Sequence, residues 1–202
     1  MTELASTAYP VVMGTARPPS SSRFWAIPII GFIVKGIILI PHFIVLYVLN
    51  IVVGLAHLII WIFVLGTGHY PDWAFALNAG YVRWTTRVYL YFYGISDVYP
   101  AFSFEAPGDM IIVAPPESSR FFAIPIIGAI ARVCLLIPHF IVLYALSVAV
   151  GFCQLVIWIP VLFGGEYPAW AYTLVGGTTL WAARVLAYLM GLTDQYPPFS
   201  FT

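Results

Sequence analysis

The chain has 202 residues, of which 62% are hydrophobic and only 8% are charged. A soluble domain carries charge on about a quarter of its residues. The composition therefore excludes an ordinary water-facing surface and predicts that apolar side chains face lipid. Lys and Arg together number 8, as do Asp and Glu, and this balance gives no support to a nucleic-acid partner.

The sequence is an internal duplication. At an offset of 97 residues, Ser22–Phe104 aligns with Ser119–Phe201 without a gap, and roughly half of the positions are identical. We therefore expect four parts: an N-terminal extended segment (1–21), a first membrane repeat (22–104), a linker with a short extended segment (105–118) and a second membrane repeat (119–202).

Each repeat begins with a short apolar segment, Phe24–Ile40 in the first and Phe121–Ile137 in the second. A helix of this length rises less than the hydrocarbon layer, which is about 30 Å thick. Each segment also carries a basic residue, Lys35 or Arg132. We therefore predict a short interfacial helix, with Pro28 in the first turn of the first copy.

The second segment of each repeat, Pro41–Leu65 or Pro138–Leu162, contains no charged residue and is long enough to cross a bilayer with some tilt. The third segment, Pro71–Tyr93 or Pro168–Met190, is also long enough to cross, but it contains arginine. It either crosses with its arginines snorkelling or buried against other helices, or lies in the interface. The sequence thus predicts an all-α integral membrane protein built from two tandem repeats.

The positions of the basic residues predict an orientation. The connections between the second and third segments, residues 66–72 and 164–168, contain no Lys or Arg, and basic flanks favour the cytoplasm. Because two similar repeats should face the same environments, we expect four crossings, with these connections outside and both termini in the cytoplasm. An inverted pair of repeats with two crossings is the alternative.

Two short stretches, Tyr9–Met13 and Met110–Ala114, are predicted to be extended and to pair into a small β element on the cytoplasmic side, with the Phe-Ser-Phe tails of the repeats nearby.

The start of the chain lacks the pattern of a secretory signal, so the first membrane helix is expected to direct insertion. Cys134 and Cys153 lie in apolar runs and are expected to be small core residues rather than a disulfide or a metal pair.

Four motifs mark the repeats: Ile-Pro-His-x-Ile-Val-Leu-Tyr (Ile40–Tyr47), Gly-x-Tyr-Pro (Gly68–Pro71), Trp-x-x-Arg-Val (Trp84–Val88) and Asp-x-Tyr-Pro-Pro-Phe-Ser (Asp194–Ser200). In these motifs the chain resembles an uncharacterised bacterial membrane family, domain of unknown function 4389, over nearly its whole length and twice. The first repeat departs from the last motif with Pro100-Ala101. The resemblance implies a multi-pass protein of the bacterial inner membrane, and it implies no activity or mechanism.

Three histidines are candidate cofactor-binding residues. His57 lies midway along the second segment, where polar groups are functional candidates, and it could hold a chlorin or haem. Its counterpart Gln154 is a poor ligand, which favours a hydrogen bond between helices. His42 and His139 are matched and each follow a proline. They form either a symmetric site or two interfacial histidines that bond helix-start backbone or lipid headgroups.

Arginine and aspartate give the most specific pattern. Arg87 and Arg184 lie shortly before Asp97 and Asp194, and ion pairs between them would fix the third segment. The alternative is binding of phospholipid phosphate by these arginines together with Arg83. The residues expected to mediate helix packing or hydrogen bonds between helices are Gly54, Gly151, Gly80, Gly177, Asn50, Ser147 and Gln154.

No catalytic or metal-binding motif is present in the sequence. We therefore expect a non-catalytic membrane protein, an accessory or scaffold subunit that packs against membrane lipids, other integral membrane proteins or itself. One alternative is a small transporter or channel at the repeat interface, lined by Asn50, His57, Ser147 and Gln154. The other is a lipid- or pigment-binding module. Beyond such a lipid or pigment, no cofactor is expected.

Overall fold

The computed structural model of the chain describes residues 9–12, 20–108, 110–115 and 117–201. The described residues are mostly helical, as the sequence predicts. The elements are β1 (Val11–Val12), α1 (Ile30–Ile38), α2 (Ile40–Thr67), α3 (Asp72–Phe92), β2 (Ile111–Ile112), α4 (Arg120–Ala123), α5 (Ile127–Gly164), α6 (Ala169–Ala171), the π-helical turn η2 (Tyr172–Gly176) and α7 (Gly177–Leu189).

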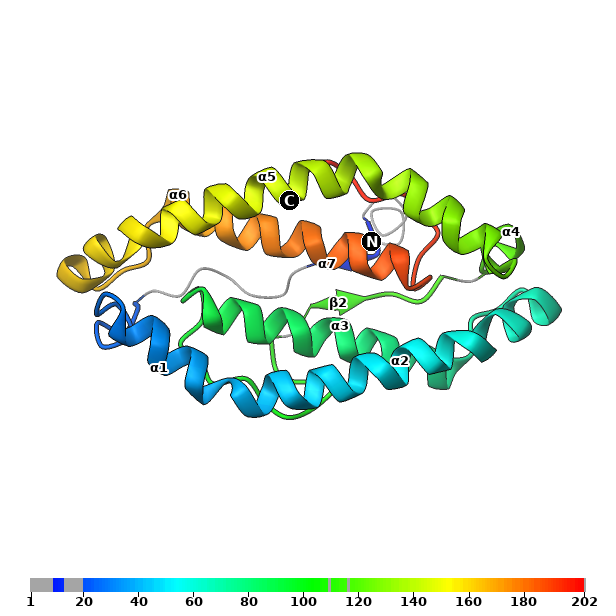
Figure 1. Cartoon of the computed structure of the whole chain (residues 1–202), viewed down its shortest axis with the longest axis horizontal. Helices are drawn as coiled ribbons and strands as arrows, with labels where there is room; N and C mark the ends of the chain where they lie inside the picture. Colours follow the sequence, from blue (N-terminus) through cyan, green and yellow to red (C-terminus); the bar gives the residue numbers. More distant parts are fainter. Residues whose placement is uncertain (1–8, 13–19, 109, 116, 202) are drawn as a thin grey trace, which may run out of the picture.

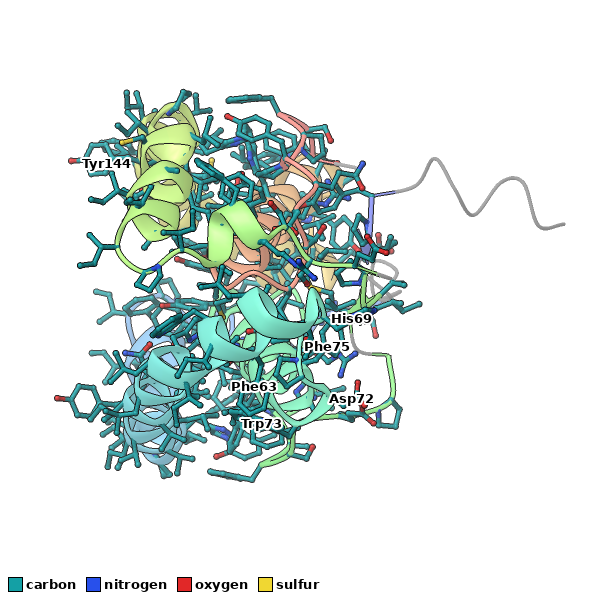
Figure 2. All side chains as sticks on the ribbon, turned by 90° about the vertical axis from the view of Figure 1, so that its right-hand side faces the viewer. Phe63, His69, Asp72, Trp73, Phe75 and Tyr144 are labelled. Atoms are coloured by element: carbon teal, nitrogen blue, oxygen red, sulfur yellow. The ribbon has the colours of Figure 1, made fainter. Side chains whose placement is uncertain are left out.

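These elements form three layers. The long helices α2 and α5 make the first layer and run in opposite directions (Figure 1). Helices α3 and α7 pack against them and against each other in the middle. Strands β1 and β2 lie on the far side of α3 and α7 (Figure 2). We call the outer surface of α2 and α5 the long-helix face, and the opposite surface, which carries β1 and β2, the strand face.

An approximate two-fold axis relates the two repeats. The Ser21 N–H donates to Gly165 O, the Ser118 N–H donates to Gly68 O, and both distances are 2.8 Å. The start of each repeat therefore contacts the end of the other repeat's long helix, and the repeats are inverted along the helix direction. If both long helices crossed a bilayer, their following connections would lie on opposite sides. The predicted arrangement of four crossings with both connections outside is therefore wrong for this fold.

The predicted separation of an interfacial helix from a long helix holds only in part. In the first repeat α1 and α2 are separated at Leu39, whereas in the second the 38-residue helix α5 contains both segments and carries Pro138 inside it. Helix α2, with 28 residues, has Pro41 in its first turn, where no backbone N–H is needed.

A strained turn precedes α1 in the first repeat and α5 in the second. Ile29 and Ile126, at equivalent positions, have φ angles of 65° and 66°. The Ile30 N–H donates to Pro28 O across Ile29 at 2.6 Å, and the same bond spans Ile126. This is a γ-turn with positive φ, which β-branched residues rarely adopt. Pro28 therefore precedes the helix, and does not lie in its first turn as predicted.

Helices α2 and α5 are the two helices of the described chain that are long and apolar enough to cross a membrane. Within their most apolar stretches only 22% and 17% of residues are buried by protein. Helix α3 is instead enclosed by its neighbours, and Asn78, Ala79, Val82 and Val88 on it are all fully buried. The long helices are thus unlike the core helix of a soluble protein.

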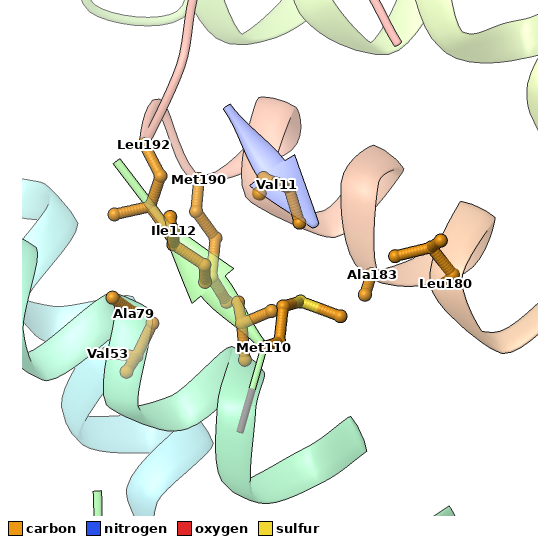
Figure 3. Packing of buried hydrophobic residues seen from close by; sticks show 11 residues of the cluster. Val11, Val53, Ala79, Met110, Ile112, Leu180, Ala183, Met190 and Leu192 are labelled. Carbon is orange, nitrogen blue, oxygen red and sulfur yellow. The ribbon is translucent and has the colours of Figure 1, made fainter. Parts of the chain in front are cut away.

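The predicted extended stretches pair as an antiparallel ladder, with Val11 opposite Ile112; Met13, the end of the first stretch, lies outside the described residues. Figure 3 shows these strands packed between α3 and α7. One side chain of each strand, Val11 or Ile112, belongs to a buried cluster to which both repeats contribute: Val11, Val53, Ala79, Val82, Met110, Ile112, Leu180, Ala183, Ala187, Met190 and Leu192. The strands therefore help to join the two repeats.

The two cysteines differ in environment. Cys153 is half-buried, but Cys134 is exposed on α5. The expectation that both are core residues is thus wrong for Cys134, because α5 buries only one side of its surface.

Candidate functional site

A buried lysine and an aspartate meet near the start of the first repeat. Lys35 Nζ lies 3.8 Å from Asp97 Oδ1 and donates a hydrogen bond of 3.0 Å to Tyr91 O. The other carboxylate oxygen of Asp97 accepts the Ser22 N–H at 2.6 Å. The ammonium also lies 5.5 Å from the centre of the Trp25 ring. Asp97 therefore ties the beginning of the repeat to the chain that follows α3.

The second repeat builds the same junction with arginine. Arg132 forms an ion pair with Asp194 and donates to Tyr188 O at 2.6 Å. Its guanidinium lies 4.5 Å from the centre of the Phe122 ring and 4.8 Å from that of Tyr188. The planar group thus fills the space between two aromatic rings.

The predicted pairs of Arg87 with Asp97 and of Arg184 with Asp194 are wrong, because the chain turns at Gly94 and Gly191, both with positive φ, and leads the aspartates to Lys35 and Arg132. Arg87 donates to Ser103 O and Arg184 donates to Val11 O, the latter at 3.1 Å. Arg83 donates to Met110 O and forms an ion pair with Glu105 at 3.1 Å. All three arginines thus contact the tail or the strand segments rather than forming one phosphate-binding cluster.

A cavity of about 580 Å³ lies beside the Lys35–Asp97 pair, where the first repeat meets α5. Its walls are mainly apolar and include six aromatic side chains: Trp25, Phe32, Phe92, Tyr93, Trp158 and Tyr167. Helix α5 contributes Gly151 and Gln154. The arrangement suits a ligand with a large apolar part and a small polar group.

The two-fold related position holds a much smaller cavity of about 100 Å³, lined by His57, Arg132 and Met190 among others. Cross-repeat hydrogen bonds border both cavities. His57 Nε2 lies 3.2 Å from Met190 O, and Gln154 donates to Tyr93 O, the equivalent carbonyl, at 3.4 Å. The mid-helix polar residues thus bond between the repeats, which is the structural alternative to a cofactor role.

The geometry of His57 does not suit a pigment ligand. Its Nδ1 lies 2.8 Å from Val53 O and its Nε2 faces Met190 O, so each ring nitrogen lies against a backbone carbonyl. Among the described residues no group of three His, Cys, Asp or Glu side chains is placed to hold a metal ion.

His42 and His139 form two separate sites rather than one symmetric site. Each is fully buried and each accepts a tryptophan N–H at Nδ1, from Trp84 or Trp181. Phe102 stacks on His42 with ring centres 3.8 Å apart. Burial also excludes the predicted interfacial contact with lipid headgroups. In both histidines Nε2 is buried without a hydrogen-bond partner in the described chain.

The packing residues divide into two classes. A Cβ on Gly80 or Gly177 would lie 2.5 Å from Phe104 or Phe201, so these glycines allow a tail ring to lie on the helix. A Cβ on Gly54 or Gly151 would meet nothing within 4 Å. Within this chain, the expectation of close helix packing is therefore wrong for the second pair.

The remaining polar candidates do not line one path. Asn50 accepts the Tyr81 hydroxyl at 3.2 Å, whereas Ser147 bonds Tyr144 O on its own helix. Both are exposed, while His57 and Gln154 border the two separate cavities. The predicted conduit of these four residues is thus not present between the repeats.

Sequence reasoning missed Lys35, Arg132 and the tail aromatics Phe102 and Phe199 as site residues. Two features of the sequence could have identified them. Lys35 matches Arg132, and Phe102 matches Phe199, at equivalent positions of the two repeats. In addition, a basic residue in an apolar segment needs a partner.

Comparison with known proteins agrees with the duplication. The profile of the family Domain of unknown function (DUF4389) matches residues 30–103 and again residues 127–200. No curated protein and no solved structure matches the chain. The chain therefore belongs to the DUF4389 family, and it carries two copies of the family's domain in tandem.

Proposed function

We propose that this chain is a non-catalytic membrane scaffold that is embedded in one leaflet through its long-helix face and presents its strand face to water. The observation that carries the proposal is the continuous apolar surface of the long-helix face, on the side opposite the strands and the exposed Glu105. The proposal keeps the bacterial inner membrane as the location, with the strand face toward the cytoplasm.

The long-helix face is apolar along the whole length of both helices. Its exposed side chains include Ile44, Val48, Ile51, Leu55, Leu58 and Ile62 on α2, and Ile141, Val148, Phe152, Leu155 and Ile159 on α5. Continuous apolar surface of this extent marks a membrane or partner interface. Lipid is the occupant that fits, because the face has two parallel ridges of aliphatic side chains and no charged residue between Pro41 and Leu65.

The position of the strands favours helices that lie along the leaflet over helices that cross it. In Figure 2, Tyr144 lies at the long-helix side and His69 and Asp72 lie toward the strand side. If α2 and α5 crossed the bilayer, the two-residue strands and the exposed Glu105 would lie at mid-membrane height. Open strand edges and charged side chains are not stable against hydrocarbon.

The two-fold axis supports the same placement. Viewed along the axis, as in Figure 1, a half-turn exchanges α2 with α5 and α3 with α7. If this axis is the membrane normal, both repeats meet the same environments at the same depth. In this placement the two similar repeats face the same environments, as expected, and four crossings are not needed.

The buried polar groups support a structural rather than a catalytic role. Arg132 bonds two backbone carbonyls and Asp194, and Arg184 bonds the strand backbone. His42 and His139 each accept a tryptophan N–H inside a packed aromatic cluster. These groups hold helices, tails and strands together.

Accessibility of two equivalent positions tests the placement. His69 and Glu166 follow α2 and α5, respectively, and both are exposed. We would place a single cysteine at one or the other in a chain without Cys134 and Cys153, and label sealed membrane vesicles of both orientations with a membrane-impermeant maleimide. Both positions should react from the same side, while a cysteine at Tyr144 reacts only after detergent is added. Reaction of His69→Cys and Glu166→Cys from opposite sides, or recovery of the chain in the soluble fraction, would overturn the proposal.

A further inference from the structure

We propose that the cavity beside Lys35 and Asp97 binds one uncharged amphiphile, with an oxygen-bearing head at Lys35 and an apolar tail directed toward the bilayer. The head carries a carbonyl, ester or hydroxyl oxygen. The inference rests on the proposed membrane placement, which supplies the ligand, and it adds a specific binding site to it.

The size and walls of the cavity fit such a molecule. Its volume of about 580 Å³ is within the range of small-molecule sites, roughly 300–1,000 Å³. The lining is dominated by aromatic and aliphatic side chains, with charge only at Lys35 and Asp97. This combination of an apolar chamber and one polar end matches an amphiphile better than a polar metabolite.

Lys35 can donate to the head of the ligand. An ammonium group has three N–H donors. One is bonded to Tyr91 O and a second faces Asp97, while the residue as a whole is only 3% exposed. Lys35 also lines the cavity, so its ammonium can donate to an acceptor oxygen of a ligand bound there.

The charge of the site selects against an anionic head. Asp97 lies 3.8 Å from Nζ and its carboxylate borders the same cavity, so the pair is neutral overall. A phosphate close enough to bond Lys35 would also approach this carboxylate, and like charges repel strongly where little water screens them. A neutral acceptor oxygen avoids this repulsion.

The rim of the cavity opens among exposed apolar side chains. Ile29, Phe32 and Leu155 all line the cavity and are 75%, 54% and 68% exposed. A tail that leaves the chamber between them would continue onto the long-helix side of α5 rather than into water. The rim thus connects the site to the surface proposed to meet lipid.

The two repeats are not equivalent here, so we expect one ligand per chain. Arg132 replaces Lys35 in the second repeat and uses its larger donor group on Tyr188 O, Thr193 O and Asp194. The cavity at that position has only about 100 Å³. The open volume beside the basic residue is thus much smaller in the second repeat than in the first.

Native mass spectrometry of the full chain in detergent tests the site. Three probes would be added separately: decylubiquinone and dioctanoylglycerol, which are uncharged and carry carbonyl oxygens, and decyl phosphate, which is anionic. We expect one bound equivalent of an uncharged probe, and the preferred one identifies a quinone or a glycerolipid as the source. Binding of decyl phosphate alone, binding of two equivalents, or no binding would overturn the inference.

Matched variants locate the ligand. Gly151→Leu places a side chain at the cavity wall where a Cβ meets no atom within 4 Å, so folding should be retained. Gly54→Leu is its counterpart and does not border the smaller cavity. We expect Gly151→Leu to weaken binding by at least about tenfold, and Gly54→Leu to leave it unchanged. Equal affinities of the two variants would contradict the assignment.

Lys35→Arg is a second, independent variant, because arginine is the residue that the second repeat accepts at this position. It should keep the ion pair with Asp97 while filling the base of the cavity, and so weaken binding. Since these measurements are made in detergent, their failure would leave the accessibility of His69 and Glu166 in vesicles unaffected. Failure of the site and failure of the membrane placement are therefore distinguishable.

Discussion

Trp84 donates its indole N–H to Nδ1 of His42 at 3.0 Å, and Trp181 makes the same bond to His139 at 2.8 Å. In the first repeat this bond connects α3 to the start of α2, and in the second it connects α7 to α5. Because Nδ1 is the acceptor, a neutral ring carries its proton on Nε2. The histidine that the sequence offers as a ligand is therefore held as a structural residue by the tryptophan of the Trp-x-x-Arg-Val motif.

We predict that Trp84→Phe destabilises the chain, because it leaves the fully buried Nδ1 of His42 without its donor while keeping an aromatic ring. The expected loss in the free energy of unfolding is about 1–3 kcal/mol, measured by thermal or denaturant unfolding in detergent. Trp73→Phe, on an exposed position of the same helix, is the control and should have little effect. Equal stabilities of the two variants would refute the role of the hydrogen bond.

The glycines provide a second prediction: substitution by alanine should change stability in opposite directions at Gly80 and Gly54. Gly80→Ala forces a Cβ to within 2.5 Å of Phe104, and such overpacking costs about 1–3 kcal/mol. Gly54→Ala meets no atom within 4 Å and should stabilise the helix by up to about 1 kcal/mol. Melting temperatures of the two variants should move in opposite directions. A melting temperature of Gly80→Ala equal to or above that of the parent chain would show that the packing of Phe104 does not require glycine at this position.

Periodicity and length predicted the helices well, since α2 and α3 match the expected segments to within a few residues. The pairing of Val11–Val12 with Ile111–Ile112 was also predictable, because each stretch is rich in β-branched residues and precedes a Pro-Pro pair. Helix length and strand propensity depend on residues that are close together in the chain, so they can be predicted from the sequence.

The relation between the repeats was not predictable in the same way. The duplication is compatible with parallel or inverted repeats, and contacts between the repeats, such as those of Ser21 with Gly165 and of Ser118 with Gly68, distinguish them. Likewise, the positive φ of Gly94 decides that Asp97 meets Lys35 instead of Arg87. Such outcomes depend on contacts between distant segments, for which a single sequence gives no direct signal.

Because the turn before α1 is strained, we predict that a substitution at Ile29 stabilises the chain. Ile29 has a φ of 65° and is 75% exposed, so its side chain gains little from packing. Backbone strain of this kind costs about 1–3 kcal/mol, and glycine adopts positive φ without it. Ile29→Gly should therefore raise the melting temperature. Ile33→Gly, at an exposed position inside the helix, should lower it by removing a side chain from regular helix. Destabilisation by both would show that the turn is not strained in solution.

The burial of Lys35 leads us to predict that the free energy of unfolding rises with pH. Burial lowers the pKa of Lys35 from 10.5 to about 8, and the Asp97 carboxylate offsets only part of this effect. Between about pH 8 and the ordinary lysine pKa, the unfolded chain binds more protons than the folded chain, so the free energy of unfolding increases as pH rises.

The melting temperature in detergent should thus increase by a few degrees from about pH 8 to about pH 9.5, a window below the ordinary pKa of tyrosine. Lys35→Arg supplies the control, because a guanidinium stays protonated in both states over this range. The difference between the two proteins isolates Lys35 from other titrating groups, including the cysteines. If the lysine and arginine proteins showed the same dependence on pH, the ammonium would not be desolvated at the cavity, and the neutral Lys35–Asp97 pair would not be the feature that sets the chemistry of the site.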